Sequence, residues 1–152
     1  MSRISRHMAR HWAEATPGQA LVEFALTVVL FIVLVMGVLD FGRAIFMYNG
    51  VSQASREVAR VTSVHPGTPL GTSAETADVI AAQEDLVPDL DVASTDFTCE
   101  DIDGDPVTTA CLTGNWVRVD LSVDYTPVTP PLAFLLGTLQ LQSSSSVQIT
   151  NH

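Results

Sequence analysis

The sequence predicts an α+β protein in which one long N-terminal helix precedes a small antiparallel β-sheet. Three patterns support this class. An uncharged apolar run covers Phe24–Leu39, apolar residues recur at helical spacing up to about residue 64, and residues 115–125 alternate with period two between an apolar set and a set that is polar apart from Trp116. The chain has 152 residues, which is enough for one domain and an appendage.

The apolar run is long enough to cross a membrane. With Ala20–Val22 before it and Phe41–Gly42 behind it, the stretch covers about 23 residues, or roughly 34 Å of helix. A transmembrane segment is therefore predicted at about 20–42. A secretory signal peptide should be shorter and carry a small-residue cleavage site behind it, and a buried helix of a soluble protein is the other alternative.

Charge is distributed unevenly and predicts the orientation of this segment. Three arginines precede it, whereas residues 61–152 hold one arginine and thirteen acidic residues. Because positive flanks stay in the cytoplasm, the N-terminus is expected inside and the acidic domain, residues 65–152, outside. Such an acidic surface should repel nucleic acid. The arginines are Arg3, Arg6 and Arg10.

The helical pattern continues beyond the predicted span. One apolar stripe follows at spacings of three and four residues, and the first proline after Pro17 is Pro66. One helix is therefore expected from about residue 20 to 64, with an outer half that needs a packing partner. The stripe consists of Met47, Val51, Ala54, Val58 and Val61.

The outer domain should contain one short helix and a small sheet. Thr72 and Glu75 fit a capping box that starts a helix over about 73–86, whose apolar residues Ala77, Ile80, Ala81 and Leu86 would face the long helix. Strands are expected at 115–125, near Leu90–Cys99 and within Thr138–Ile149, and a short helix at Leu132–Leu136.

The two cysteines, Cys99 and Cys111, are expected to form a disulfide outside the membrane; free buried thiols are the alternative. Between them, Asp101, Asp103 and Asp105 resemble part of a calcium loop. The order of an EF-hand is absent, however, and Asp/Gly runs also make plain turns, which is the favoured interpretation. No cofactor is expected.

No enzyme is expected, because no catalytic constellation can be assembled from these residues. Asp40-Phe41-Gly42 matches the kinase magnesium triplet by letters only, since the chain has no lysine and no His-Arg-Asp motif. Asp40 and Arg43, three apart, are instead expected to pair on the helix at the outer membrane face. Glu57 and Arg60 suit either a solvated charged face, which is favoured, or contacts between subunits.

A family resemblance enters at the start of the apolar run. Gly18-Gln19-Ala20-Leu21-Val22-Glu23-Phe24 resembles the class III signal of type IV prepilins, and the wider stretch over about 17–62 resembles the TadE-like family of the tight-adherence (Flp) pilus. The resemblance implies cleavage after Gly18 by a prepilin peptidase, with Gln19 as the new N-terminus and Glu23 as its fifth residue. Phe24 stands where tyrosine is commoner.

The resemblance also implies partners: other pilin subunits, the pilus assembly platform and membrane lipid. A carboxylate at the rim of a lipid span needs a partner, so Glu23 is expected to pair with the new α-amine of Gln19 on a neighbouring subunit. In the alternative interpretation, Glu23 is merely solvated among headgroups. The size of the outer domain favours a minor pilin or pseudopilin at the cell surface. The rival is an uncleaved single-pass membrane protein whose outer domain binds a partner in a pilus or secretion assembly.

Overall fold

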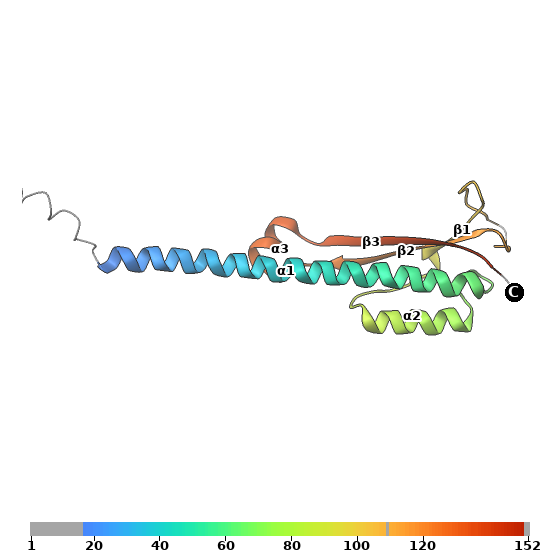
Figure 1. Ribbon diagram of the computed structural model, residues 1–152, viewed down its shortest axis with the longest axis horizontal. Coiled ribbons are helices and arrows are strands. Elements are labelled where there is room, and N and C mark those ends of the chain that lie inside the picture. Colours follow the sequence, from blue (N-terminus) through green and yellow to red (C-terminus); the bar gives the residue numbers. More distant parts are fainter. Residues whose placement is uncertain (1–16, 109, 151–152) are drawn as a thin grey trace, which may run out of the picture. The chain divides into compact units, whose positions relative to one another are not determined.

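The computed structural model describes residues 17–108 and 110–150 (Figure 1). Internal contacts divide the chain between Leu39 and Asp40 into two units, and each is described by itself. The predicted leader, Met1–Gly18, lies outside the described residues except for its last two positions.

Helix α1 spans Pro17–Val64 and contributes to both units. It begins three residues before the expected start, at a proline, whose fixed φ and missing N–H suit the first position of a helix. It ends at Val64, two residues before Pro66, as the sequence predicts. The single long helix is thereby confirmed.

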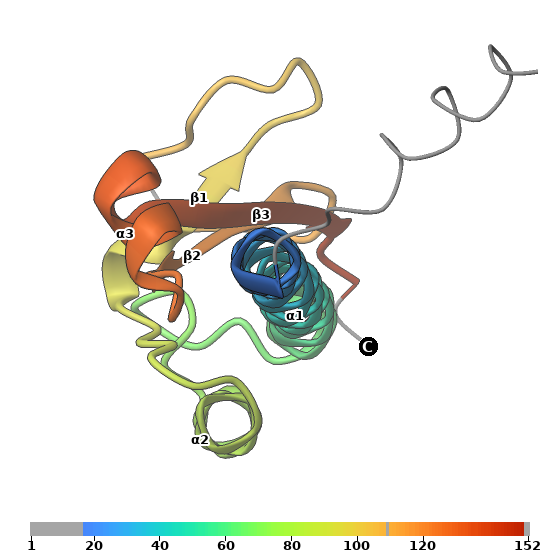
Figure 2. The same ribbon diagram turned by 90° about the vertical axis from the view of Figure 1, so that its left-hand side faces the viewer.

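The unit that begins at Asp40 has three layers (Figures 1 and 2). The sheet covers one side of the α1 segment that starts at Asp40, and helix α2, Ala74–Leu86, lies on the other side. The outer half of the long helix is therefore the middle layer and has a partner on both sides. The segment accordingly has fully buried residues near both partners: Ser55 lies against Ser143 of the sheet, and Thr62 lies against Thr76 of α2.

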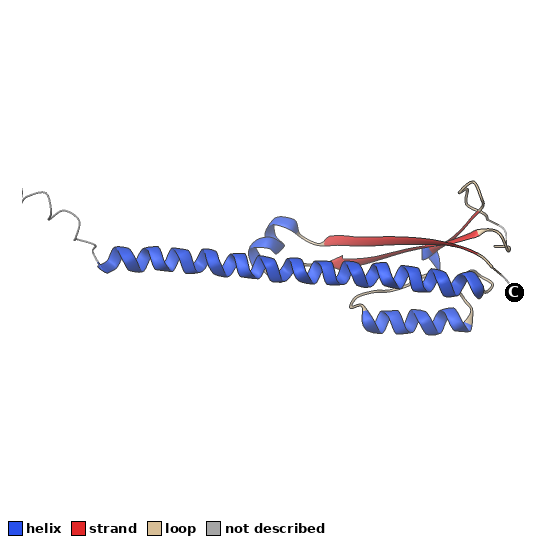
Figure 3. Cartoon of the chain, in the orientation of Figure 1, coloured by secondary structure: helices blue, strands red, loops and turns tan. Residues whose placement is uncertain are grey.

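Three antiparallel strands form the sheet in the order β1-β2-β3 (Figure 3). They span Phe97–Glu100, Trp116–Tyr125 and Leu139–Gln148, with Phe97 opposite Val119 and Val119 opposite Ser145. The α+β class and the second and third strands are confirmed. The first strand is shorter than expected, because residues Ser94–Asp96 form a 3-10 turn before it.

Strand β2 supplies the sheet side of the core. Its residues alternate without exception between exposed and buried, which is the pattern that the sequence predicts. The buried set faces α1, where the hydroxyls of Ser55 and Ser143 lie 3.3 Å apart and mark the helix–sheet contact. The buried β2 residues are Val117, Val119, Leu121, Val123 and Tyr125.

The predicted stripe on α1 is confirmed at four of its five positions. Met47, Val51, Ala54 and Val58 are buried, but Val61 is only half-buried and Thr62 is fully buried instead. The reason lies in α2, whose Thr76 places its hydroxyl 3.4 Å from that of Thr62. A polar pair thus continues the buried face where an apolar residue was expected.

Helix α2 starts one residue later than expected and turns a different face to the core. Its N-cap is Ser73, whose hydroxyl accepts a bond from the Thr76 N–H, whereas the Thr72 hydroxyl donates to the Pro69 carbonyl. Thr76 is buried, and the expected contacts Ala77, Ala81 and Leu86 are exposed. The choice of Thr72 as cap and of Ala77, Ala81 and Leu86 as contacts was therefore wrong, whereas Ile80 is half-buried and packs against the core as predicted.

Two glycines allow close approaches that the core requires. A Cβ on Gly50 would lie 3.0 Å from a methyl group of Val87, the C-cap of α2, so the missing side chain lets that end of α2 reach α1. Gly71 has φ +81, and its Cβ would lie 2.9 Å from the ring of Phe97.

The disulfide between Cys99 and Cys111 is present, with a Cα–Cα distance of 5.8 Å. It ties the end of β1 to the loop before β2 across a separation of twelve residues. The outer domain is small for a single core, so a covalent link of this kind supplies stability that packing alone does not. The prediction of a disulfide rather than two free thiols is confirmed.

Replacing both cysteines by serine is expected to lower the free energy of unfolding by about 3 kcal/mol, because the unfolded chain regains the entropy of an open ring. Denaturant unfolding of the full chain in detergent measures this change. Reduction should destabilise the wild type equally and leave the double variant unaffected. Equal stability of the oxidised wild type and the double variant would contradict the expectation.

Candidate functional site

The segment from Gly18 to Leu39 is helical, and its large apolar side chains are exposed. Phe24 is 67% exposed and Leu30 is 71% exposed, far above what a soluble surface tolerates in a continuous run. By length and composition this is one helix that could cross a membrane, among the residues that the structure describes. Its apolar side chains therefore need a partner outside this chain.

Glu23 lies on this segment as an exposed carboxylate surrounded by apolar residues. Thr27 donates a hydrogen bond of 2.8 Å to the Glu23 backbone carbonyl, and no ion pair joins the Glu23 side chain to another described residue. Gln19 lies four residues earlier, so the two positions share one face of the helix about 6 Å apart along its axis. The exposed carboxylate is thus accessible to a cation from another molecule.

Gly18 has no reason to be glycine within the described fold. It is exposed, and a Cβ placed there would meet nothing within 4 Å. Both Gly18 and Gln19 lie in the first turn of α1. Any requirement for a missing side chain at this position must come from a partner that binds the segment.

Asp40, the first residue of the second unit, is buried and accepts hydrogen bonds from the segment after β2. The N–H groups of Val128 and Thr129 donate to its carboxylate at 3.0 and 2.9 Å, and the Thr129 hydroxyl donates to the same oxygen as the Thr129 N–H. Thr129 is the N-cap of helix α3, Pro130–Leu136. The carboxylate therefore fixes the start of α3 beside Asp40.

The structure corrects the expectation that Asp40 and Arg43 form an ion pair on the helix. No ion pair joins them in the described part of the chain. Two backbone N–H groups at a buried turn need an acceptor, and a carboxylate that satisfies both stabilises more than an exposed pair on a helix. The Arg43 guanidinium instead lies over the ring of Tyr125, 5.5 Å from its centroid.

Tyr125 completes this junction at the end of β2. Its buried hydroxyl donates a 2.7 Å bond to the Asp40 backbone carbonyl. Burial, together with the nearby Asp40 charge, raises the pKa of the Tyr125 phenol. Asp40 thus binds β2 and α3 at once, through its main chain and its side chain.

The remaining predicted charges lie on exposed surfaces. Arg60 forms two bonds with the Glu57 carboxylate, at 2.6 and 3.0 Å, and this hydrogen bonding lowers the pKa of Glu57. The side chains of Arg60 and Glu57 are 65% and 41% exposed, which fits the favoured solvated face.

The Asp-rich loop forms a turn around one carboxylate. Asp101 accepts bonds of 2.9 Å from the N–H groups of both Asp103 and Asp105. Among the described residues, no cluster of three acidic, cysteine or histidine side chains could hold a metal ion. The turn accounts for the Asp/Gly spacing without calcium.

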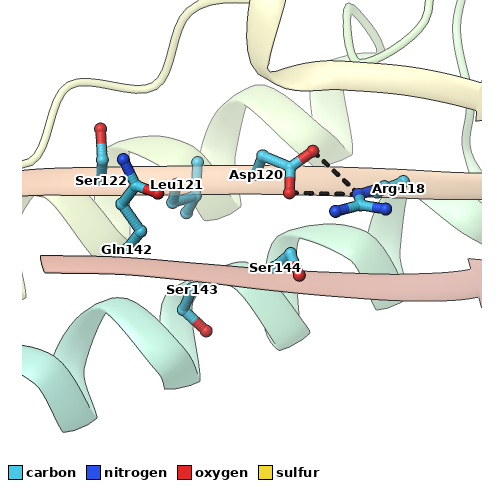
Figure 4. A pocket seen from close by; sticks show the side chains of 7 residues that line it. All are labelled: Arg118, Asp120, Leu121, Ser122, Gln142, Ser143 and Ser144. Carbon is cyan, nitrogen blue, oxygen red and sulfur yellow. Dashed lines mark hydrogen bonds and ion pairs between the residues drawn. The ribbon is translucent and has the colours of Figure 1, made fainter.

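A shallow pocket lies across β2 and β3 on the sheet (Figure 4). Its charged members are Arg118 and Asp120, which form an ion pair of 3.0 Å, while Glu100 lies 3.5 Å from the same guanidinium. The other lining residues carry hydroxyl, amide or apolar side chains. The Arg118 guanidinium is already neutralised by two carboxylates, so this pocket is poorly suited to bind an anion.

Comparison with known proteins identifies the helical segment. Residues 18–60 match the family model described as TadE-like protein. The resemblance is confirmed over this region. The TadE-like match covers Gly18, Gln19, Glu23 and Phe24 together with the start of the second unit, and it points to a protein associated with tight-adherence pili. No curated protein and no solved structure matches the chain.

Gly18, Gln19, Glu23 and Phe24 remain predicted site residues, and sequence reasoning missed the partners of Asp40. Backbone N–H groups carry no side-chain signature, so Val128 and Thr129 could not be singled out. One indirect signal existed: the run Thr129-Pro130-Pro131 is typical of a helix start, where an acidic side chain is a favourable neighbour.

Proposed function

We propose that the chain is a minor pilin or pseudopilin of a tight-adherence pilus, cut after Gly18 by a prepilin peptidase and assembled through α1. The observation that carries this proposal is Glu23, an exposed carboxylate on an apolar helix within the TadE-like match, with no ion pair to any described residue. Placing a charged carboxylate in lipid is unfavourable in free energy, and a cationic partner on another molecule would remove most of this cost.

Cleavage would supply that partner. The new α-amine of Gln19 is cationic at neutral pH, and a neighbouring subunit displaced along the fibre axis can bring it to Glu23. An ion pair in a low-dielectric bundle is stronger than in water, and its hydrogen-bond geometry specifies one stagger between subunits. Glu23 then acts only after Gln19 has become a free N-terminus.

The size of the outer domain supports a minor role. The unit that begins at Asp40 carries two further α-helices, a three-stranded sheet and a disulfide, and the exposed acidic turn stands at its surface. A domain of this bulk suits a tip or initiating position better than dense packing along a thin fibre. The cytoplasmic membrane, with the N-terminus inside, is its place before assembly.

Replacing Glu23 by alanine should leave membrane insertion intact and reduce incorporation into sheared fibres at least about tenfold, because the pairing charge is lost. Quantitative mass spectrometry of fibre and membrane fractions measures both. Glu57→Ala is the matched control, since Glu57 is a partly exposed carboxylate on the same helix, and it should incorporate normally.

Two outcomes would contradict the proposal. Unchanged incorporation of Glu23→Ala would remove the pairing role. An intact mass that retains residues 1–18 in surface material would instead favour an uncleaved single-pass protein with a partner-binding outer domain.

A further inference from the structure

Helix α3 and the turn before it expose apolar side chains at one end of the outer domain. Phe134 is 95% exposed, Leu135 is 77% exposed and Val128 is 68% exposed. No residue of α3 is buried, so the helix contributes nothing of its own to the core. Exposed apolar side chains that gather on one short element mark an interaction surface. We name Val128, Phe134 and Leu135 the α3 patch.

The α3 patch adjoins the residue with which the second unit begins. The Asp40 carboxylate binds the N–H groups of Val128 and Thr129, and Asp40 directly follows Leu39 in the chain. If the bilayer holds residues up to about 42, the start of α3 is therefore kept at its outer surface by these bonds. Phe41, which is 67% exposed, is the next residue after Asp40.

Charge within the second unit is arranged to suit this placement. Residues 126–150 contain no acidic or basic side chain, although the chain as a whole has a net charge of −10. The acidic turn at 101–105 follows β1, whose Glu100 lies opposite Trp116 at the start of β2, whereas α3 follows the other end of that strand. Ten residues of strand separate the two by about 30 Å. The end of the unit that contains Asp40 thus carries few charged side chains, namely Asp40, Arg43 and Asp124, and the acidic turn belongs to the opposite end.

We propose that the α3 patch docks into the headgroup–acyl boundary of the membrane that holds the span. A seven-residue helix alone would bind a bilayer weakly. Because Asp40 holds α3 next to a span that is already in the bilayer, the patch stays close to the membrane surface. Docking of the patch therefore costs little further translational entropy. Docking covers Phe134 and Leu135 with lipid and gives the outer domain a defined position before assembly.

Quenching by brominated lipid tests the contact in the full chain. Phe134→Trp is reconstituted in liposomes that contain lipids brominated near the headgroup end of the acyl chain, and the emission is compared with that of the wild type, which contains two tryptophans. The added emission should fall about twofold or more, because an interfacial side chain lies only about 5–10 Å deep at the boundary. Ile102→Trp is the matched control: Ile102 is 85% exposed in the acidic turn and should not be quenched.

The other outcomes would overturn the proposal. Unquenched emission of the Phe134→Trp variant, in chains that float with the liposomes, removes the docking surface but leaves the span intact. A third outcome would assign the patch to a contact with a second copy of the chain. The added emission would then be unquenched and blue-shifted in liposomes, and the blue shift would be lost in nanodiscs that hold one chain each. Quenching of both variants would mean that the whole domain lies on lipid. None of these results depends on pilus assembly, so the proposed function is tested separately.

Discussion

Replacing Asp40 by asparagine is expected to lower the Tm of the outer domain by roughly 10 °C, because a buried carboxylate that accepts three hydrogen bonds is lost. Asparagine keeps the shape but offers one acceptor oxygen and one NH₂ group. The two carboxylate oxygens receive the N–H groups of Val128 and Thr129 separately. Whichever way the amide turns, one of these donors faces the NH₂ group.

Thermal unfolding of the full chain in detergent, followed by near-UV circular dichroism, measures this change. Asp124→Asn is the matched control, since Asp124 is an exposed aspartate on β2 with no ion pair in the described part of the chain. It should shift the Tm by no more than about 2 °C. Equal shifts in the two variants would show that the Asp40 bonds do not hold the junction together.

Replacing Gly18 by leucine is expected to abolish removal of the leader. A peptidase that binds the segment in an extended form needs a slim backbone next to the cut, and leucine fills that space. The substitution should not disturb the fold, because a Cβ at Gly18 meets nothing within 4 Å. Intact-mass measurement of membrane-extracted protein should show the full-length chain in the variant and the shortened chain in the wild type.

Gly37→Leu provides the control for this experiment. Gly37 lies in the same helix and also has open space around it, so the variant should insert and be processed normally. A processed Gly18→Leu chain would disprove the cleavage site, and an unprocessed Gly37→Leu chain would point to a general defect of insertion.

The secondary structure was largely predictable because local pattern and tertiary packing agree in this chain. The alternation in β2 and the stripe from Met47 to Val58 both face one core, so periodicity alone located them. The prediction of the α2 N-cap failed because two adjacent residues are equally suited to that position. Thr72 and Ser73 are both good caps, and only the position of Thr76 against Thr62 selected Ser73.

The candidate site at the start of α1 could be proposed from sequence for a different reason. Gly18, Gln19, Glu23 and Phe24 are consecutive or nearly so, and their relation is set by one helix without any tertiary contact. Asp40 was misinterpreted because its partners are 88 and 89 residues away in the chain. A charge three residues from an arginine suggests a local pair, and nothing in the linear order reveals a distant pair of backbone donors.

The sequence by itself therefore determined the α+β class, the apolar segment, the long helix and the position of Glu23 within it, since each depends on spacing along one element. Only the tertiary structure decided that Asp40 fixes the start of α3, that Arg43 lies over Tyr125, and that the α3 patch adjoins Asp40. Each of these features is a contact between residues about 80 to 90 positions apart. Such contacts depend on backbone donors and on the sheet, and their geometry exists only after the core has formed.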